Sequence, residues 1–154
     1  MVAEGQPAPD FTLPDQNGEP MTLSALRGAP VVLYFYPRDH TPGCTNEACA
    51  FRDAYPSYQD LGAQVLGISP DDIRSHQKFA DKHSLPFPLL ADPEKEVCTA
   101  YGVWKEKNLY GKKTLGVERT TFLIDRDGII RKVFPRVKVA GHSNAVLDAL
   151  RALA

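Results

Sequence analysis

Residues 31–51 read VVLYFYPRDHTPGCTNEACAF, and this stretch decides the fold. Its first six residues form a continuous apolar run, which is typical of a strand buried on both faces of a sheet. Pro37 ends the run, and the polar residues 38–43 form a predicted loop. From there the residues Cys44, Ala48, Phe51, Tyr55 and Tyr58 recur at the spacing of one helical face. The stretch therefore predicts a central strand that leads directly into a helix.

A second buried strand is predicted at residues 65–69, which read VLGIS. Asp71 or Asp72 then caps a helix that runs to about His83. Strand, helix and strand in this order imply a right-handed crossover and parallel pairing of the two strands.

Shorter elements flank this unit. We expect an N-terminal hairpin from residues 11–13 and 21–23, a single turn at 25–27 capped by Ser24, an extended edge segment at 85–90, a short helix from Asp92 through Tyr101, a hairpin from 120–124 and 129–134, and a last helix capped by Ser143. The predicted fold class is α/β. It is a thioredoxin-like fold with a central mixed β-sheet flanked by helices and an N-terminal β-hairpin, in a single domain of residues 1–154.

Two local features modify this outline. Pro56 lies inside the helical pattern and lacks an N–H, so it predicts two helical pieces that meet near Tyr55. Residues 105–116 are polar and punctuated by glycine, which predicts a mobile loop.

Composition narrows the class of protein. The net charge of -1 gives no electrostatic reason to expect a nucleic-acid partner, and no apolar run is long enough to cross a membrane. The N-terminus has neither a basic start nor an apolar segment of the secretory kind, so we expect a cytoplasmic protein. Three cysteines are an odd count, which favours a chemical role over a disulfide framework.

Cys44 is the candidate nucleophile. It lies at the first turn of the predicted helix, where free backbone N–H groups and the helix dipole stabilise an anion, so the thiol should ionise readily. Gly43 allows close approach of the backbone, and the Thr41 hydroxyl can accept a proton or orient a bound peroxide oxygen. Pro37 and Pro42 would stiffen the loop. The alternative is that Cys44 is an inert buried thiol.

Cys49 favours the chemical interpretation. Five residues apart in an intact helix, Cys44 and Cys49 have Cα atoms about 8.6 Å apart, beyond the ~7 Å limit for a disulfide. A bond between them requires the first turns to unwind, which fits a catalytic pair better than a structural link. In the predicted cycle Cys44 attacks a peroxide, becomes a sulfenic acid, and is resolved by Cys49 to a disulfide that an external dithiol reduces.

Two other kinds of cysteine site fit this sequence less well. A Cys-x4-Cys pair is neither the Cys-x-x-Cys of a disulfide exchanger nor part of a zinc-finger ligand set. Cys98 is interpreted as a buried, inert thiol, with a role as a substitute for Cys49 or in pairing between chains as the alternative.

Arg119 precedes the predicted strand at 120–124 and is a candidate for stabilising the thiolate and the departing oxygen. His40 is conceivable as a base toward Cys44. Asp39 and Glu47 are interpreted as solvated charges, and no role is assigned to His76, His83 and His142.

Several motifs now resemble one family. FYP at 35–37, TPGCT at 41–45, EAC at 47–49 and FRD at 51–53 are similar to a peroxiredoxin of the bacterioferritin-comigratory-protein (PrxQ) subfamily. The similarity continues in order through APDF at 8–11, GIS at 67–69, YGVW at 101–104 and ERTTFLID at 118–125. Pro56 is a departure from that pattern.

This resemblance implies a thiol peroxidase that reduces hydrogen peroxide and organic hydroperoxides to water and alcohols. Cys44 would be the peroxidatic cysteine, Cys49 the resolving cysteine, and Pro37, Thr41 and Arg119 the residues of the peroxide pocket. It implies no metal and no organic cofactor, thioredoxin or a glutaredoxin-type protein as reductant, and a monomer, with a dimer as the alternative.

Two other functions remain open from the residues. One is a redox sensor or chaperone-like binding protein in which a Cys44–Cys49 disulfide reports peroxide without efficient turnover. The other is a hydrolase that uses Cys44 and His40.

Overall fold

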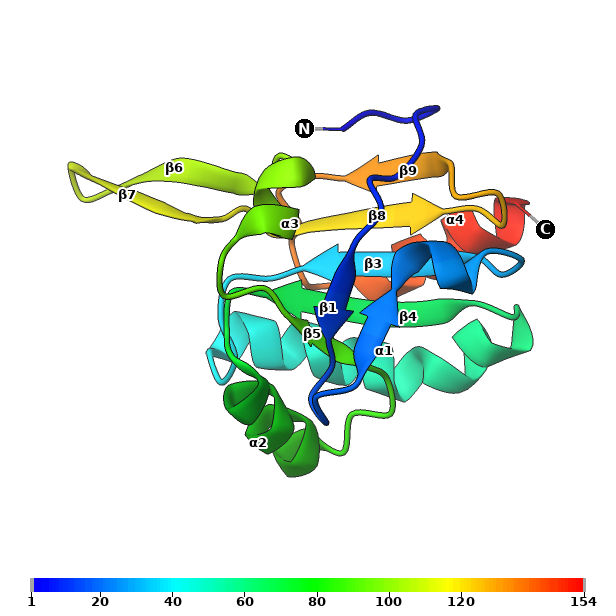
Figure 1. Cartoon of the computed structure of the whole chain (residues 1–154), viewed down its shortest axis with the longest axis horizontal. Coiled ribbons are helices and arrows are strands. Elements are labelled where there is room, and N and C mark those ends of the chain that lie inside the picture. Colours follow the sequence, from blue (N-terminus) through cyan, green and yellow to red (C-terminus); the bar gives the residue numbers. More distant parts are fainter. Residues whose placement is uncertain (1, 154) are drawn as a thin grey trace.

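Strand β3 (Val31–Phe35) lies in the middle of a five-stranded sheet in the computed structural model, which describes residues 2–153 (Figure 1). In spatial order the strands are β5 (Leu89–Ala91), β4 (Gln64–Ser69), β3, β8 (Thr120–Ile124) and β9 (Ile130–Phe134). β3 and β4 are parallel, and β8 is antiparallel to β3 and β9. The predicted mixed sheet and parallel crossover are confirmed.

Helices cover both faces of this sheet. They are the 3-10 helix η1 (Leu23–Leu26), α1 (Pro42–Asp60), α2 (Ile73–His83), α3 (Glu96–Ala100) and α4 (His142–Leu153). One core cluster joins the sheet to α1, α2 and α4, and a second core cluster joins its other face to α3, η1 and the N-terminal segment. In Figure 1, α1 and α4 run behind the sheet, while α3 and the N-terminal hairpin lie in front of it. This is the predicted thioredoxin-like arrangement.

The predicted N-terminal hairpin is present as β1 (Thr12–Pro14) and β2 (Pro20–Thr22). Asp72 caps α2 as predicted, since its carboxylate accepts the N–H of Ser75 at 2.8 Å. No helix within residues 2–153 is both long and apolar enough to span a bilayer.

The pairing of β3 with β8 positions the future site. Phe35, the last residue of β3, lies opposite Thr120, the first residue of β8. Because the two strands are antiparallel, the loop that follows β3 and the residue that precedes β8 meet at the same edge of the sheet. That residue is Arg119, and the loop leads to Cys44.

The prediction that Pro56 divides the helix is wrong, because α1 is continuous from Pro42 to Asp60. Pro56 is exposed, so the backbone carbonyl that it leaves unpaired faces solvent. On either side of it, Phe51 and Tyr58 are buried in the same core cluster, and the Tyr58 hydroxyl donates to the backbone carbonyl of Ser143 at 2.8 Å. Packing of the turns on both sides outweighs the local cost of proline.

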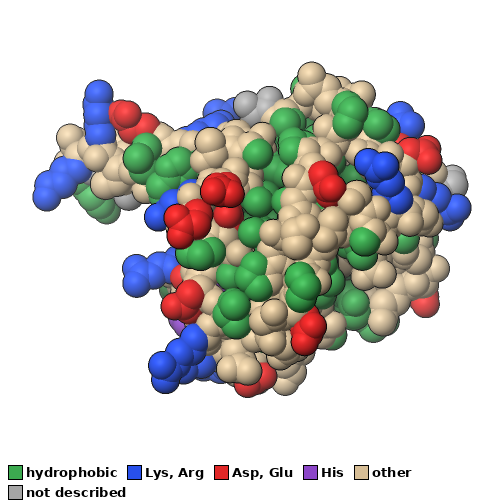
Figure 2. Space-filling view, viewed as in Figure 1, with side chains coloured by type: hydrophobic (Ala, Val, Ile, Leu, Met, Phe, Trp, Pro, Cys, Tyr) green, Lys and Arg blue, Asp and Glu red, His purple; other side chains and the backbone are tan. Residues whose placement is uncertain are grey.

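The prediction of a loop at residues 105–116 is also wrong. The segment forms the antiparallel hairpin β6 (Trp104–Leu109) and β7 (Lys112–Val117), joined at Tyr110 and Gly111 with φ of 52° and 78°. Two successive positive φ values are the geometry of the tight hairpin turn. The hairpin extends away from the body, with lysine side chains gathered at its outer end (Figures 1 and 2). Its exposed residues show no inside–outside alternation, so the sequence pattern did not reveal the strands.

Three helix starts differ from prediction. Ser24 lies inside η1, and its backbone N–H donates a hydrogen bond to the Asp10 carboxylate at 2.8 Å. Ser143 lies inside α4, which begins at His142, and α3 begins at Glu96 rather than at Asp92. Asp92 still serves the start of α3, because its carboxylate accepts the backbone N–H of Cys98 at 2.8 Å.

Candidate active site

Cys44 is the third residue of α1, and its side chain is buried, with 1% of the residue exposed. Thr41 is the N-cap residue in extended conformation, and Pro42 occupies the first helical position. Thr41 makes no capping hydrogen bond, and the first turn holds no acidic residue. The N–H groups of this turn and the positive end of the helix dipole are therefore free to stabilise an anion beside the sulfur.

Arg119 reaches this sulfur from the segment before β8. Its Nη2 donates to Cys44 Sγ at 3.3 Å, and its Nη1 donates to Glu47 Oε1 at 2.7 Å. Among the described residues, Arg119 is the side chain that hydrogen-bonds to Sγ. Burial lowers the pKa of Arg119, but Glu47 and Cys44 raise it further, so the guanidinium remains charged. The structure thus brings together two of the residues singled out in the sequence.

Gly43 explains how the guanidinium can lie so close to the helix. A Cβ atom at Gly43 would be 3.2 Å from Arg119 Nη2, closer than an ordinary van der Waals contact. Glycine therefore leaves room for Arg119 to lie over the first turn of α1. The expectation that Gly43 permits a close approach is confirmed, with a side chain rather than the backbone as the neighbour.

Glu47 is not the solvated charge that the sequence predicted. It is buried, with 1% of the residue exposed, and its Oε2 has no hydrogen-bond partner among the described residues. Burial raises the pKa of Glu47 to about 7, although Arg119 acts in the opposite direction. The available signal was spacing, because a residue three positions after Cys44 lies on the same helical face. Glu47 holds the guanidinium through Nη1, while Nη2 donates to the sulfur.

Thr41 and Pro37 lie in the loop between β3 and α1, and both are half-buried. The Thr41 hydroxyl donates to the backbone carbonyl of Arg38 at 2.9 Å, which leaves its oxygen lone pairs available as acceptors. Pro37 directly follows the buried Tyr36 at the end of the central strand. The loop holds Thr41 three residues before the nucleophile.

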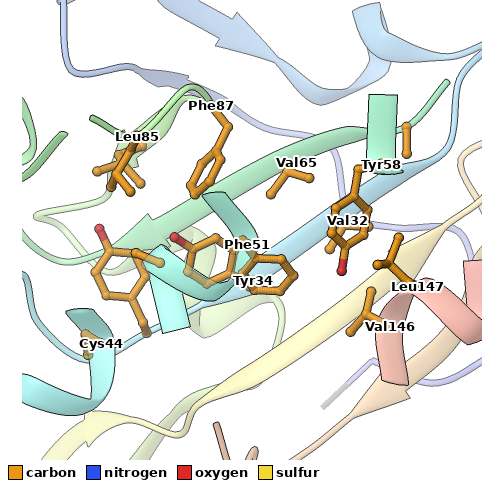
Figure 3. Packing of buried hydrophobic residues seen from close by; sticks show 14 of the residues in the cluster. Val32, Tyr34, Cys44, Phe51, Tyr58, Val65, Leu85, Phe87, Val146 and Leu147 are labelled. Atoms are coloured by element: carbon orange, nitrogen blue, oxygen red, sulfur yellow. The ribbon is translucent and has the colours of Figure 1, made fainter. Parts of the chain in front are cut away.

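The sulfur of Cys44 lies at the margin of an aromatic core. Figure 3 shows Cys44 at one side of the cluster that includes Tyr34 and Phe51, whose rings stack at 4.8 Å between centroids. Glu47 shares Arg119 with the sulfur, and charges interact more strongly in such surroundings than in water. The packing therefore strengthens the contact between Arg119 and Sγ.

The other two cysteines are also free thiols. Cys49 is the half-buried eighth residue of α1, and the intact helix keeps it away from Cys44, as predicted from their spacing. Cys98 is buried in the second core cluster, on the opposite face of the sheet. Burial raises the pKa of Cys98 far above that of a free thiol, and Asp92 raises it further. This is the environment of an inert thiol.

Two further residues of this loop are Asp39, which was predicted to be solvated, and His40, which was considered as a base toward Cys44. Asp39 was interpreted as solvated but is buried, and its carboxylate accepts hydrogen bonds from Tyr36 and Ser75 and lies against His76. His40 is exposed, and its ring packs edge-on against Phe79 at 5.2 Å between centroids. His40 is therefore engaged away from Cys44, which disfavours the hydrolase alternative.

Comparisons with known proteins agree with this geometry. The family model for AhpC/TSA matches residues 4–133. Peroxiredoxin Bcp of Bacillus subtilis is 48% identical over 147 residues, covering 96% of this chain and 94% of that protein. Peroxiredoxin Bcp of Escherichia coli is 45% identical over 147 residues, with the same coverage of 96% and 94%.

Solved structures show the same similarity. The Xanthomonas campestris bacterioferritin comigratory protein, solved in work on its alkyl peroxide reduction activity, has a TM-score of 0.89 and 44% identity, covering 92% of this chain and 90% of that one. A cysteine-to-serine variant of Xylella fastidiosa PrxQ has a TM-score of 0.94 and 36% identity, covering 99% and 97%.

Proposed function

The chain belongs to the AhpC/TSA family, and we propose that it reduces hydroperoxides with Cys44 as the attacking thiolate and Cys49 as the resolving thiol. It is a thiol peroxidase of the peroxiredoxin kind. One observation carries the assignment of Cys44. Its sulfur lies at an uncapped helix N-terminus and accepts a hydrogen bond from a buried guanidinium.

In the first step the Cys44 thiolate attacks the terminal oxygen of the hydroperoxide, and the O–O bond breaks. The sulfur is oxidised to a sulfenic acid, and the other oxygen leaves as water or an alcohol after taking a proton. Negative charge moves from sulfur to the leaving oxygen during this step. Arg119 is placed to donate to both, because its guanidinium offers several N–H groups in one plane.

Thr41 and Pro37 complete the proposed peroxide pocket. The Thr41 hydroxyl oxygen accepts a hydrogen bond from the O–H group of the peroxide and aligns the O–O bond with the sulfur. Pro37 shields the thiolate from water at the end of β3. Both roles are supported by the position of these residues in the loop that leads to Cys44.

In the second step the Cys49 thiol attacks the sulfenic sulfur, forming a disulfide and releasing water. Because α1 is continuous through both cysteines, its first turns must unwind for this bond to form. The start of α1 favours this change, since no side chain caps the N–H groups of its first turn.

An external dithiol then restores both thiols, and we propose thioredoxin or a glutaredoxin-type protein for this step. We further propose that residues 1–154 act as one domain, as a monomer with a dimer as the alternative, in the cytoplasm. Neither a nucleic acid, a membrane, a metal nor an organic cofactor has a part in the proposed cycle.

The test treats the reduced protein with one equivalent of hydrogen peroxide and locates any new bond by mass spectrometry of the chain and its peptides. We expect rapid loss of two hydrogens, a peptide that links Cys44 to Cys49, and its removal by thioredoxin. In the Cys49→Ser variant the sulfenic acid at Cys44 should persist, whereas Cys98→Ser should behave as the unmodified protein. A bond from Cys44 to Cys98, or no reaction at Cys44, would contradict the proposal.

A further inference from the structure

A buried charged group lies under the loop that carries Pro37 and Thr41. Asp39 Oδ2 and His76 Nδ1 are 2.7 Å apart, and their side chains are 1% and 0% exposed. Asp39 comes from the loop and His76 from α2. None of the steps proposed above uses either residue.

The contacts of the imidazole ring define its protonation state. His76 Nε2 is 3.0 Å from the backbone carbonyl oxygen of Leu90, which can only accept a hydrogen bond. His76 Nδ1 faces the carboxylate of Asp39, which also only accepts when it is ionised. A neutral imidazole has one N–H, so it can satisfy only one of these contacts. Both are satisfied together when each ring nitrogen carries a proton.

Asp39 is well suited to remain ionised. Its Oδ1 accepts from the Tyr36 hydroxyl at 2.6 Å, and its Oδ2 accepts from Ser75 Oγ at 2.8 Å as well as from His76. Burial raises the pKa of Asp39, but the hydrogen bond and charge of His76, with the hydroxyl donors, lower it further, and the net shift is downward. The carboxylate is thus the partner that an imidazolium requires.

The other groups around His76 also favour a positive charge. Asp71, from the segment before α2, adds a second carboxylate. A carboxylate oxygen of Asp39, one of Asp71 and a ring nitrogen of His76 all lie within 4.8 Å of one another. Tyr36, at the end of β3, presents a neutral hydroxyl 3.4 Å from Nδ1, and β5 presents the Leu90 carbonyl. Two carboxylates therefore face one imidazolium, which offsets its cost of burial.

This network holds the loop by two attachments. Besides the side-chain contacts of Asp39, its backbone N–H donates to Asp71 Oδ2 at 2.8 Å. The next residue, His40, has a φ of 64°, a conformation that non-glycine residues adopt only when the surroundings enforce it. Thr41 follows as the N-cap of α1. A loosened Asp39 would therefore displace the start of the helix that bears Cys44.

Building on the proposed function, we propose that His76 is a positioning residue for peroxide reduction. Its doubly protonated ring pairs with Asp39 and fixes the loop of Pro37 and Thr41 against Cys44. Loss of either ring contact loosens Asp39 and relaxes the pocket. The rate of peroxide reduction thereby depends on residues that do not touch the peroxide.

Nitrogen NMR of the imidazole rings in the reduced protein tests the protonation state without any use of peroxide. We expect both ring nitrogens of His76 to carry protons, because each of them faces a hydrogen-bond acceptor. A single N–H on His76 would overturn the proposal. This result is independent of whether the protein reduces peroxides.

Rapid kinetics of Cys44 oxidation test the positioning role. We expect His76→Gln to slow the oxidation of Cys44 about tenfold. Asp39→Asn should have a similar effect, and the double variant should be no slower than either single variant, because no unpaired charge remains. The matched control is His83→Gln in the last turn of the same helix, which should stay within about twofold.

The outcomes separate this proposal from the proposed function. An unchanged rate of Cys44 oxidation in folded His76→Gln and Asp39→Asn variants would refute the role of the pair. If His76→Gln does not fold, Asp39→Asn and the NMR result decide. If the unmodified protein fails to oxidise Cys44 at all, the peroxidase assignment fails while the NMR result still stands.

Discussion

Cys44 and Cys98 occupy equivalent positions in two different helices on opposite faces of the sheet. Each is the third residue of its helix, and the exposed fractions of the two residues are 1% and 0%. The charge that faces each thiol is different. Cys44 receives a hydrogen bond from the Arg119 guanidinium, whereas Cys98 lies against the carboxylate of Asp92. Helix position and burial are shared, so neither of them can explain which thiol is reactive.

The first turns of α1 and α3 also differ in the negative charge beside them. The first turn of α1 has no capping side chain and no acidic residue. At α3, Asp92 accepts the N–H groups of Val97 and Cys98, so a carboxylate already occupies the positive end of the helix. A helix N-terminus stabilises a thiolate only when no built-in anion fills it. The comparison therefore attributes the proposed reactivity of Cys44 to its partners.

The largest expected difference follows from removing each sulfur. Cys44→Ser should lower the rate of peroxide consumption about ten-thousandfold or more, because a serine hydroxyl is a far weaker nucleophile than a thiolate. Cys98→Ser should leave the rate nearly unchanged. Peroxide consumption with a dithiol donor measures both, and a fully active Cys44→Ser variant would overturn the assignment of the nucleophile.

The next effect concerns the guanidinium. Arg119→Ala should lower the rate of Cys44 oxidation about 100- to 1,000-fold, the loss typical of one buried donor to a developing charge. Adding Glu47→Gln to this variant avoids leaving an unpaired buried carboxylate and separates the chemical effect from instability. Arg126→Ala, on an exposed turn, is the control. Equal losses in Arg119→Ala and Arg126→Ala would remove Arg119 from the account.

Glu47 should make the stability of the Cys44 region depend on pH. Because burial raises the pKa of Glu47 to about 7, the folded state keeps a proton that the unfolded state loses near pH 4.5. The free energy of unfolding is therefore highest below about pH 4.5. It falls by about 3 kcal/mol as the pH rises to about 7. Denaturant unfolding at several pH values should show this slope in the unmodified protein and not in Glu47→Gln. Parallel pH curves for the two proteins would contradict the buried titration.

The smallest expected effect comes from removing the negative charge beside Cys98. Asp92→Asn keeps an oxygen acceptor for the start of α3 but removes the negative charge, so the pKa of Cys98 should fall toward that of a free thiol. We expect alkylation of Cys98 at alkaline pH to become a few times faster, since burial still limits access. Peptide mass spectrometry after timed alkylation gives this rate, and no change would show that burial alone controls the thiol.

Sequence patterns predicted the parts of this picture that depend on local order. The apolar run at 31–36, the loop after Pro37 and the helix from Cys44 follow from periodicity and proline, and the structure contains them. Arg119 was chosen mainly by family resemblance, because its proximity to Cys44 arises from the register of β3 with β8. No single-residue property reveals such a register.

The errors share a physical cause. Glu47 and Asp39 were interpreted as solvated because isolated carboxylates are usually exposed, yet each has a basic partner from a distant part of the chain. Pro56 was expected to break α1, but packing of Phe51 and Tyr58 keeps the helix intact. In each case a tertiary contact outweighs the local preference that the sequence pattern displays.

The most direct test of this account compares the two buried thiols within one molecule. The Cys49→Ser variant, which cannot resolve a sulfenic acid by the proposed route, is treated with limiting hydrogen peroxide while a sulfenic-acid trap is present, and the labelled peptides are quantified. The account predicts label almost entirely at Cys44, with Cys98 labelled at least about a hundredfold less. Comparable labelling of both cysteines, or preferential labelling of Cys98, would contradict the claim that partner charge makes Cys44 the reactive thiol.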